Sequence, residues 1–424
     1  MNLKHFVIAL TVIGVLIGCE NQKSYDLVIR NGSIIDGSGE KSFIGSIAIN
    51  ADTIAAIGDL KNAVGSVEID ASGLTVAPGF INMLSWANVS LIEDGRSQGD
   101  IRQGVTLEVM GEGHSMGPLN EAMKLEMKES QQNITYDINW TTLGEYLEYL
   151  EEKGISTNIA SFVGNGTLRE YVMNYETRPP NATELEKMKE LAKEAMEEGA
   201  VGLSTSLIYV PSGHAKTEEI IELAKVAAAY DGMYVSHIRD EEEHLLDAVQ
   251  ELITISREAE IRSEIYHFKA SGNANWHLLD SAITLVDNAR KEGLPITTDM
   301  YMYNASSTGL NVVLPAWAKE GGHKKTMELI AQPEKRNQMI KEIDFHVPPE
   351  KILLVGFRNE QMRQLIGKTL AEIAEDRNIS AAEAVVDLIQ EDNSRIQVVY
   401  FSMSEENIKK KLALPYMAIC SDAG

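Results

Sequence analysis

The chain has 424 residues, of which 44% are hydrophobic and 24% are charged, so it is long enough to fold as one large domain with a small accessory domain. These proportions are ordinary for globular proteins and argue against a disordered chain. The formal net charge of −25 at pH 7 disfavours binding to nucleic acid or to anionic lipid headgroups, and an anionic substrate would need local cations at its site.

The chain begins with a short apolar segment that has the shape of an export signal. The apolar run from Phe6 to Ile17 follows a lysine and is too short for a comfortable membrane span. Leu16-Ile17-Gly18-Cys19 resembles the lipobox of bacterial lipoproteins, in which the cysteine is lipidated. We therefore expect residues 1–18 to be a lipoprotein signal peptide, and residues 19–24 to be a tether that anchors the protein to a membrane of the bacterial cell envelope through Cys19. The alternatives are an ordinary cleaved signal with an incidental cysteine and an uncleaved anchor.

Two regions with different sequence patterns follow along the chain. Residues 25–78 contain short strand patterns separated by turns, which predict part of a β-sandwich. Four helix-then-strand units come later, with helical periodicity at 184–198, 218–230, 245–259 and 278–292, and apolar runs at 201–208, 233–237, 263–268 and 295–300. Such connections force a parallel sheet, and the polar residues at its strand ends favour an α/β fold of the (β/α)8 TIM type over residues 79–424.

One segment interrupts the predicted barrel. Residues 318–350 are rich in Lys, Glu and Gln and contain three prolines, which indicates a helical insertion. Strand patterns at 351–357, 396–401 and 415–422 are expected to resume the barrel.

Two histidines stand where neighbouring strand patterns end. His237 closes the run from Gly232, and His267 closes the run from Ser263; each is followed within two residues by a cation. Because parallel strands of a barrel end at the same side, the two imidazoles should meet there and could bind a metal ion. The alternative for each is a buried histidine that is satisfied by a backbone carbonyl.

The chain resembles the N-acyl-D-amino-acid deacylases, or D-aminoacylases, of the metal-dependent amidohydrolase superfamily. The similarity rests on eight segments that follow the family's order over nearly the whole chain: Asp26–Gly32, Ala77–Ile81, Gly104–Thr106, Gly202–Ser204, Thr217–Glu219, Ser236–Glu241, Asp299–Thr308 and Cys420–Asp422. The resemblance implies hydrolysis of an N-acyl-D-amino acid, or a related amide or dipeptide, to a carboxylate and a D-amino acid by a metal-activated water.

The resemblance also implies the metal ligands. His237 and His267 match the two histidines that hold the family's tightly bound ion, and neutral imidazoles suit zinc. A cysteine supplies the third ligand in the family, but this chain has none at the corresponding place. Glu112 is the expected substitute, and His114 is a second candidate.

A larger departure follows Pro78-Gly79-Phe80-Ile81. The family has a His-x-His pair there that holds a second ion, whereas this chain has Leu84 and Trp86, which cannot bind zinc. We therefore expect one zinc ion per chain, with both side chains as apolar lining. The alternative is a barrel that has lost its catalytic activity.

The remaining site residues are also implied by the resemblance. Asp422 matches the family's catalytic aspartate and would act as a general base, although a turn or helix-capping aspartate is the ordinary alternative. Lys269 matches the lysine that binds the substrate carboxylate, and the substrate-binding segment is represented by Tyr301, Tyr303, Ser306 and Ser307.

The sequence stops two residues after Asp422, at Gly424. Either the chain is a fragment of a longer protein, or its β-unit and barrel closure are incomplete; we expect a fragment, truncated at the C-terminus. Two other functions stay open at this point: a lipid-anchored binding protein without catalysis, and an amidohydrolase of other specificity, such as one for cyclic amides.

Overall fold

A computed structural model describes residues 23–131 and 134–424, which form two compact units divided after Gly79. The division lies one residue from the predicted boundary. The predicted signal peptide and Cys19 fall outside the described residues. Among the described residues, no helix combines the length and the apolar character that crossing a membrane requires.

The first unit is a single five-stranded sheet. Its strands are β1 (Lys23–Ile34), β2 (Phe43–Asn50), β3 (Thr53–Gly58), β4 (Ala63–Asp70) and β5 (Thr75–Val76). The long strand β1 pairs with β2 along one edge and with both β4 and β5 along the other, so four strands follow the order β3-β2-β1-β4 and β5 continues beside β1. Residues 23–79 therefore supply one sheet, as expected of part of a sandwich.

The second unit contains a barrel of eight parallel strands, in agreement with the predicted class. The barrel strands are β6 (Phe80–Asn82), β7 (Val105–Met110), β8 (Asn158–Ser161), β10 (Gly202–Ser206), β11 (Met233–His237), β12 (Arg262–Ile265), β13 (Ile296–Met300) and β17 (Met417–Ile419), while β9 (Val163–Gly164) extends the edge of β10. They form two sheets, β6-β7-β8 and β9-β10-β11-β12-β13-β17.

Backbone hydrogen bonds close the gaps between these two sheets. Val201 N donates to Ser161 O at 3.0 Å between β8 and β10. On the other side, Trp86 N donates to Ala423 O and Asp422 N donates to Leu84 O, each at 2.9 Å. The residues just after β17 therefore pair with those just after β6 and close the ring of strands.

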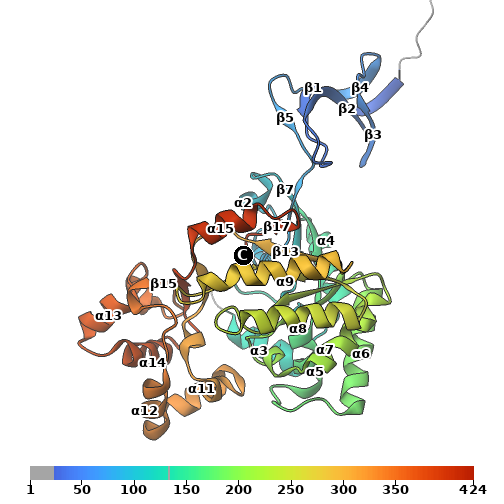
Figure 1. The fold of residues 1–424 in the computed structure, drawn as a ribbon. Helices are drawn as coiled ribbons and strands as arrows, with labels where there is room; N and C mark the ends of the chain where they lie inside the picture. Colours follow the sequence, from blue (N-terminus) through green and yellow to red (C-terminus); the bar gives the residue numbers. More distant parts are fainter. Residues whose placement is uncertain (1–22, 132–133) are drawn as a thin grey trace, which may run out of the picture. The chain divides into compact units, whose positions relative to one another are not determined.

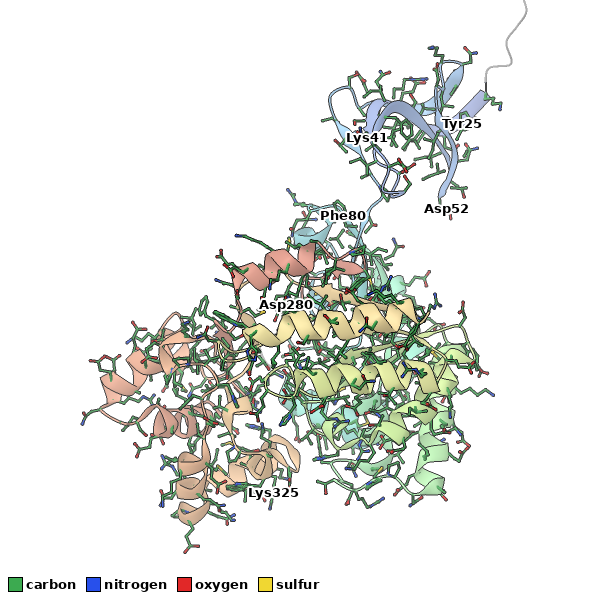
Figure 2. The ribbon with its side chains drawn as sticks, in the orientation of Figure 1. Tyr25, Lys41, Asp52, Phe80, Asp280 and Lys325 are labelled. Atoms are coloured by element: carbon green, nitrogen blue, oxygen red, sulfur yellow. The ribbon has the colours of Figure 1, made fainter. Side chains whose placement is uncertain are left out.

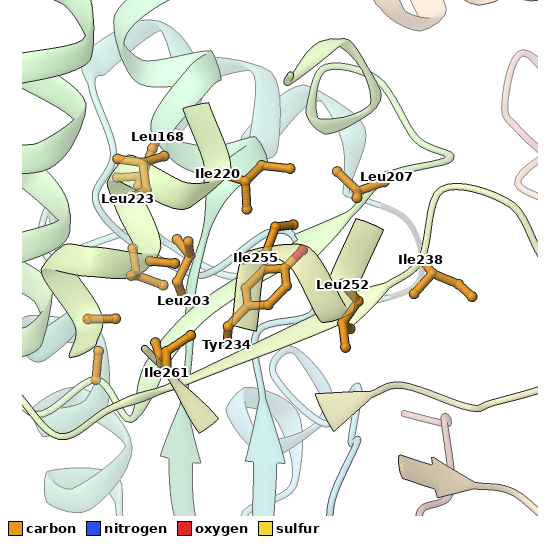
Figure 3. Close-up of a cluster of buried hydrophobic side chains, with 14 of the residues drawn as sticks. Leu168, Leu203, Leu207, Ile220, Leu223, Tyr234, Ile238, Leu252, Ile255 and Ile261 are labelled. Atoms are coloured by element: carbon orange, nitrogen blue, oxygen red, sulfur yellow. The ribbon is translucent and has the colours of Figure 1, made fainter. Parts of the chain in front are cut away.

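Helices surround the barrel. They are α1 (Ser90–Glu93), α2 (Gln98–Ile101), α3 (Glu121–Ser130), α4 (Leu143–Lys153), α5 (Asn165–Met173), α6 (Ala182–Glu197), α7 (Thr217–Ala228), α8 (Leu245–Glu258), α9 (Leu279–Lys291) and α15 (Glu405–Leu412), with 3-10 turns η1 (Ser212–His214) and η2 (Trp276–Leu278). The longer ones, such as α6, α7, α8 and α9, bury an apolar stripe. In Figure 3, side chains of α7 and α8 such as Ile220 and Leu252 pack around Leu203 and Tyr234 of the strands. Burial of such side chains is the main stabilising contribution to the fold.

Helices α8, α9 and α15 lie next to one another on one side of the barrel (Figure 1). Lys410 of α15 forms an ion pair with Asp280, which projects from the start of α9 in Figure 2, at 2.8 Å. This contact joins α15, the last helix before β17, to the start of α9.

Residues 306–400 form an insertion with its own core, larger than the predicted 318–350. Its elements are β14 (Ser306–Gly309), η3 (Leu310–Val313), α10 (Ala316–Lys319), α11 (Gly322–Ile330), α12 (Pro333–Glu342), η4 (Pro349–Lys351), β15 (Ile352–Gly356), η5 (Glu360–Leu365), α13 (Leu370–Arg377), α14 (Ala381–Asp392) and β16 (Gln397–Tyr400). The patterns at 351–357 and 396–401 are not barrel strands, because β15 and β16 pair antiparallel in a separate sheet with β14. They bury Leu354 and Val398 among the insertion's own helices instead.

Candidate metal centre

Three potential metal ligands meet at the carboxyl ends of three barrel strands. Glu112 follows β7, His237 ends β11, and His267 lies two residues after β12. Glu112 Oε1 lies 2.9 Å from His237 Nδ1 and 3.2 Å from His267 Nε2, and all three ligand atoms lie within 4.8 Å of one another. All three side chains are buried. Two imidazoles and one carboxylate are a donor set that fits zinc and leaves a fourth position for water.

The local backbone explains how Glu112 reaches the histidines. It stands between Gly111 and Gly113, which adopt φ angles of +98° and +62°, a region that favours glycine. A Cβ at Gly111 would lie 2.5 Å from Phe162 O, and Gly113 N donates to Ser204 Oγ at 3.0 Å. This tight turn between two neighbouring strands allows the chain to present a carboxylate where β7 ends.

His267 is held in a strained backbone conformation. Its φ angle is +35°, which is unusual for a residue other than glycine. Its backbone N–H donates to Oδ1 of the buried Asp299 on the next strand. The side chain that binds this N–H helps to hold the conformation, and such strain is a common feature of functional sites.

A second layer of polar contacts surrounds the two histidines. Glu241 Oε1 lies 3.0 Å from His267 Nδ1, and Glu241 Oε2 lies 3.7 Å from His237 Nε2. Lys269 Nζ lies 2.7 Å from His267 Nδ1 and also forms an ion pair with Glu241. Carboxylates that contact the outer nitrogen of a ligand histidine fix its orientation and tautomer.

Sequence reasoning gave Glu241 no role. The available signal was an acidic residue four positions after a strand-end histidine, in the same loop, but loop conformation decides where such a side chain lies. Tyr209 was missed as well: its ring lies 5.3 Å from that of His237, and its hydroxyl lies 2.9 Å from Thr308 Oγ1.

The charges of the cluster are strongly coupled. Burial would raise the pKa of Glu112, but hydrogen bonds from His237 and His267 outweigh it and hold that pKa well below its ordinary value. Burial and the Lys269 ammonium lower the pKa of His267, whereas the carboxylates of Glu241 and Glu112 raise it to about 10 overall. Burial lowers the pKa of His237. With this raised pKa, His267 is protonated at neutral pH, and its positive charge stands where a bound metal ion would supply one.

Asp422 lies at the same end of the barrel, immediately after β17. Burial raises its pKa to about 6, while the nearby positive charge of His267 acts in the opposite direction. The indole Nε1 of Trp86 donates to Asp422 Oδ1 at 3.0 Å. Leu84 is fully buried and is part of the barrel core, as expected, but Trp86 is 41% exposed and provides a polar contact, so it is more than apolar lining.

The structure brings some of the predicted substrate-binding residues to the cluster. Lys269 and Tyr301 are buried, and the Tyr301 ring lies 6.2 Å from that of His267 and 5.6 Å from Lys269 Nζ. Tyr303 is 62% exposed and stacks on Tyr301. Ser306 and Ser307 belong to β14, where Ser307 Oγ donates to Val398 O at 3.1 Å, and neither has a hydrogen bond to the described residues of the cluster.

The second candidate for the third ligand, His114, is placed differently. Its Nε2 lies 3.9 Å from Glu170 Oε2, and the metal-ligand cluster found among the described residues does not include it. The geometry therefore favours Glu112 as the residue that stands in for the cysteine.

A closed barrel of eight parallel strands with histidine and carboxylate ligands at its carboxyl end defines a metal-dependent barrel hydrolase. No family model matches the chain. It is 30% identical over 410 residues to a D-aminoacylase of Alcaligenes xylosoxydans xylosoxydans, which covers 95% of this chain and 75% of that protein. The chain belongs to the D-aminoacylase family of amidohydrolases.

Further comparisons agree with this assignment. An N-acyl-D-glutamate deacylase of the same organism is 32% identical over 327 residues, which cover 76% of this chain and 65% of that protein. A crystal structure of D-aminoacylase, described as defining a novel subset of amidohydrolases, superposes with a TM-score of 0.76 at 29% identity, over 94% of this chain and 76% of that one. The N-acyl-D-glutamate deacylase of Bordetella bronchiseptica, solved with zinc and a phosphonate inhibitor, gives a TM-score of 0.77 at 26% identity, over the same shares of the two chains.

Proposed function

We propose that the protein is an N-acyl-D-amino-acid deacylase that uses a single zinc ion to release a D-amino acid and a carboxylate. The observation that carries this proposal is the buried cluster of Glu112, His237 and His267, with Asp422 at the same end of the barrel. The names of the related deacylases support the substrate class. Family membership favours catalysis over a binding protein without turnover, and an N-acyl-D-amino acid over a cyclic amide.

Glu112, His237 and His267 would hold the zinc ion, which when bound supplies a Lewis acid for the amide carbonyl and lowers the pKa of water. Asp422 accepts the proton of the attacking water as the new C–O bond forms. It then transfers this proton to the amide nitrogen, so that the C–N bond breaks and the amine leaves. A base with a pKa of about 6 is mostly ionised at neutral pH and can still return its proton.

The acidic chain needs a local cation to bind an anionic substrate. Lys269 supplies that charge next to the cluster, and Glu241 holds its ammonium in place. Tyr301 lies beside both Lys269 and His267 and would orient the substrate carboxylate. D-selectivity comes from the family assignment alone.

The direct test is hydrolysis of a panel of N-acyl-D-amino acids by zinc-loaded protein, with the L-enantiomers as controls and chiral chromatography of the released amine. We expect release of D-amino acids, and loss of that release in the matched variant Asp422→Asn, which keeps the side-chain volume. Zinc-loaded protein that releases no amine from any member of the panel would refute the proposal.

A further inference from the structure

Trp86 lies in the segment that follows β6, and its indole contacts the candidate base. The ring nitrogen Nε1 lies 3.0 Å from Asp422 Oδ1, and an indole N–H can only donate a hydrogen bond. Among the described residues, no hydrogen bond to Asp422 Oδ2 is present. One carboxylate oxygen is therefore fixed while the other stays available.

The backbone around this contact restricts Asp422 further. Asp422 N donates to Leu84 O and Trp86 N donates to Ala423 O, both at 2.9 Å, so the segment after β6 and the segment after β17 run in register. Ser85 and Ala423 form a parallel bridge between them. Asp422 adopts a φ angle of +51°, which these neighbouring bonds maintain.

The group that donates a hydrogen bond to Asp422 is an indole and not an imidazole. Histidine at this place could bind a second cation beside Asp422, whereas an indole is neutral at all pH values and cannot bind zinc. In the described part of the chain, the ligand cluster contains only Glu112, His237 and His267, and none of its members comes from the segment after β6. A neutral donor orients the carboxylate without placing a second full positive charge on it.

We propose that Trp86 is a positioning residue for Asp422: its indole N–H holds Oδ1 so that Oδ2 faces the reacting groups. The proposal rests on the proposed deacylase function for its catalytic consequence, but the contact itself can be measured without substrate. A hydrogen bond to a charged group has a large enough effect for its loss to be visible in kcat.

The first experiment is an NMR measurement on protein labelled with 15N at the indole nitrogens. The sequence contains four tryptophans, so the Trp86 signal can be assigned from its absence in Trp86→Phe. We expect the Trp86 indole resonance to move in Asp422→Asn while the other three stay in place. A Trp86 signal that does not respond to Asp422→Asn would overturn the proposal, whether or not the enzyme is active.

The second experiment compares the kinetics of two matched variants of the zinc-loaded protein. Trp86→Phe keeps an aromatic ring but removes the donor, and we expect kcat to fall about tenfold with KM changed by less than about threefold. Trp317→Phe is the control, because it removes an indole–carboxylate hydrogen bond to Glu342 inside the insertion, and it should leave both constants unchanged.

The outcomes separate the two proposals. Trp86→Phe that binds zinc like the wild type and keeps its kcat within about twofold would overturn the positioning role. Wild-type protein that releases no amine, but whose Trp86 resonance depends on Asp422, would refute the deacylase function and still uphold the hydrogen bond that positions Asp422.

Discussion

Glu112 is the only carboxylate in the proposed zinc-binding cluster, where it accompanies His237 and His267. We expect the wild type to bind about one zinc ion per chain and Glu112→Ala to lose it, since two imidazoles alone hold zinc weakly. Glu112→Cys keeps an anionic donor that suits zinc and should retain the ion. Elemental analysis of the purified proteins measures the ratio, and an unchanged zinc content in Glu112→Ala would exclude this residue as a ligand.

We expect Leu84 and Trp86 to limit the proposed site to one ion. A D-aminoacylase structure is described in terms of a binuclear centre with one-metal activation and second-metal attenuation. Because neither leucine nor tryptophan binds zinc, we expect excess zinc to leave the rate of this protein unchanged. The double variant Leu84→His/Trp86→His should bind a second ion and become sensitive to excess zinc. Inhibition of the wild type at the same zinc concentrations would contradict the one-ion proposal.

Zinc binding should displace a proton from His267. The pKa of this histidine is raised to about 10, so at pH 8 it is protonated in the metal-free protein and must lose its proton to bind zinc. We expect His267 to contribute about one released proton per zinc at pH 8, in addition to the proton of the zinc-bound water, and calorimetry in buffers of different ionisation enthalpy measures the total. Glu241→Gln removes a charge that raises this pKa and should reduce the release. Equal proton release in both proteins would show that Glu241 does not control the protonation of His267.

The individual site residues differ in how far the sequence could predict them. His237 and His267 could be expected together because strand ends of a parallel barrel meet at one side. Glu112 could be proposed only because the family has a ligand there, and its closeness to His237 depends on the turn at Gly111 and Gly113. Glu241 could not be predicted, because a loop of several residues separates it from the strand that it supports.

At the scale of whole elements, a buried ion pair joins two barrel helices. Arg169 of α5 and Glu219 of α7 lie 2.5 Å apart, with their side chains 0% and 2% exposed. Arg169→Met would leave a buried carboxylate without its partner and should lower the free energy of unfolding by about 3–5 kcal/mol. Arg178→Met is the control, because its ion pair with Glu184 is exposed and should contribute little.

Denaturant unfolding of the two variants measures this difference, and the double variant Arg169→Met/Glu219→Leu should recover most of the lost stability because no unpaired charge remains. Equal destabilisation by Arg169→Met and Arg178→Met would mean that burial of the pair has no energetic consequence.

The elements themselves were predictable to different degrees. Helical and strand periodicity identified the barrel units from residue 184 to residue 300, because each helix there leads into a parallel strand. The same periodicity misassigned β15 and β16 to the barrel. An apolar run shows that a strand is buried, but it does not show against which sheet, and here the partners are in the insertion.

At the scale of the whole molecule, the strand pattern of the N-terminal unit predicted its strands but not what packs against their sheet. Its five strands were expected as part of a sandwich, and residues 23–79 form one sheet on which apolar side chains such as Ile44 and Leu74 are 75% and 60% exposed. The alternation of apolar residues indicates that one face of a strand is to be buried. It does not indicate which segment packs against that face.

We propose that lipid on Cys19 holds the whole molecule at a membrane of the cell envelope. With 63 acidic against 38 basic side chains, the protein is repelled by anionic headgroups, so attachment must come from acyl chains and not from surface charge. We expect labelled palmitate to be incorporated into the wild type in a bacterial host, and the protein to stay in the membrane fraction after a wash at high salt.

The chain offers an internal control for this prediction, because its only other cysteine is Cys420, which is buried in the barrel. Cys19→Ser should abolish the palmitate label, since the thiol is the attachment site of the lipid. Cys420→Ser should keep the label. Labelled Cys19→Ser protein, or unlabelled wild type that leaves the membrane in high salt, would contradict lipid attachment at Cys19 and leave the apolar run from Phe6 to Ile17 as an ordinary export signal.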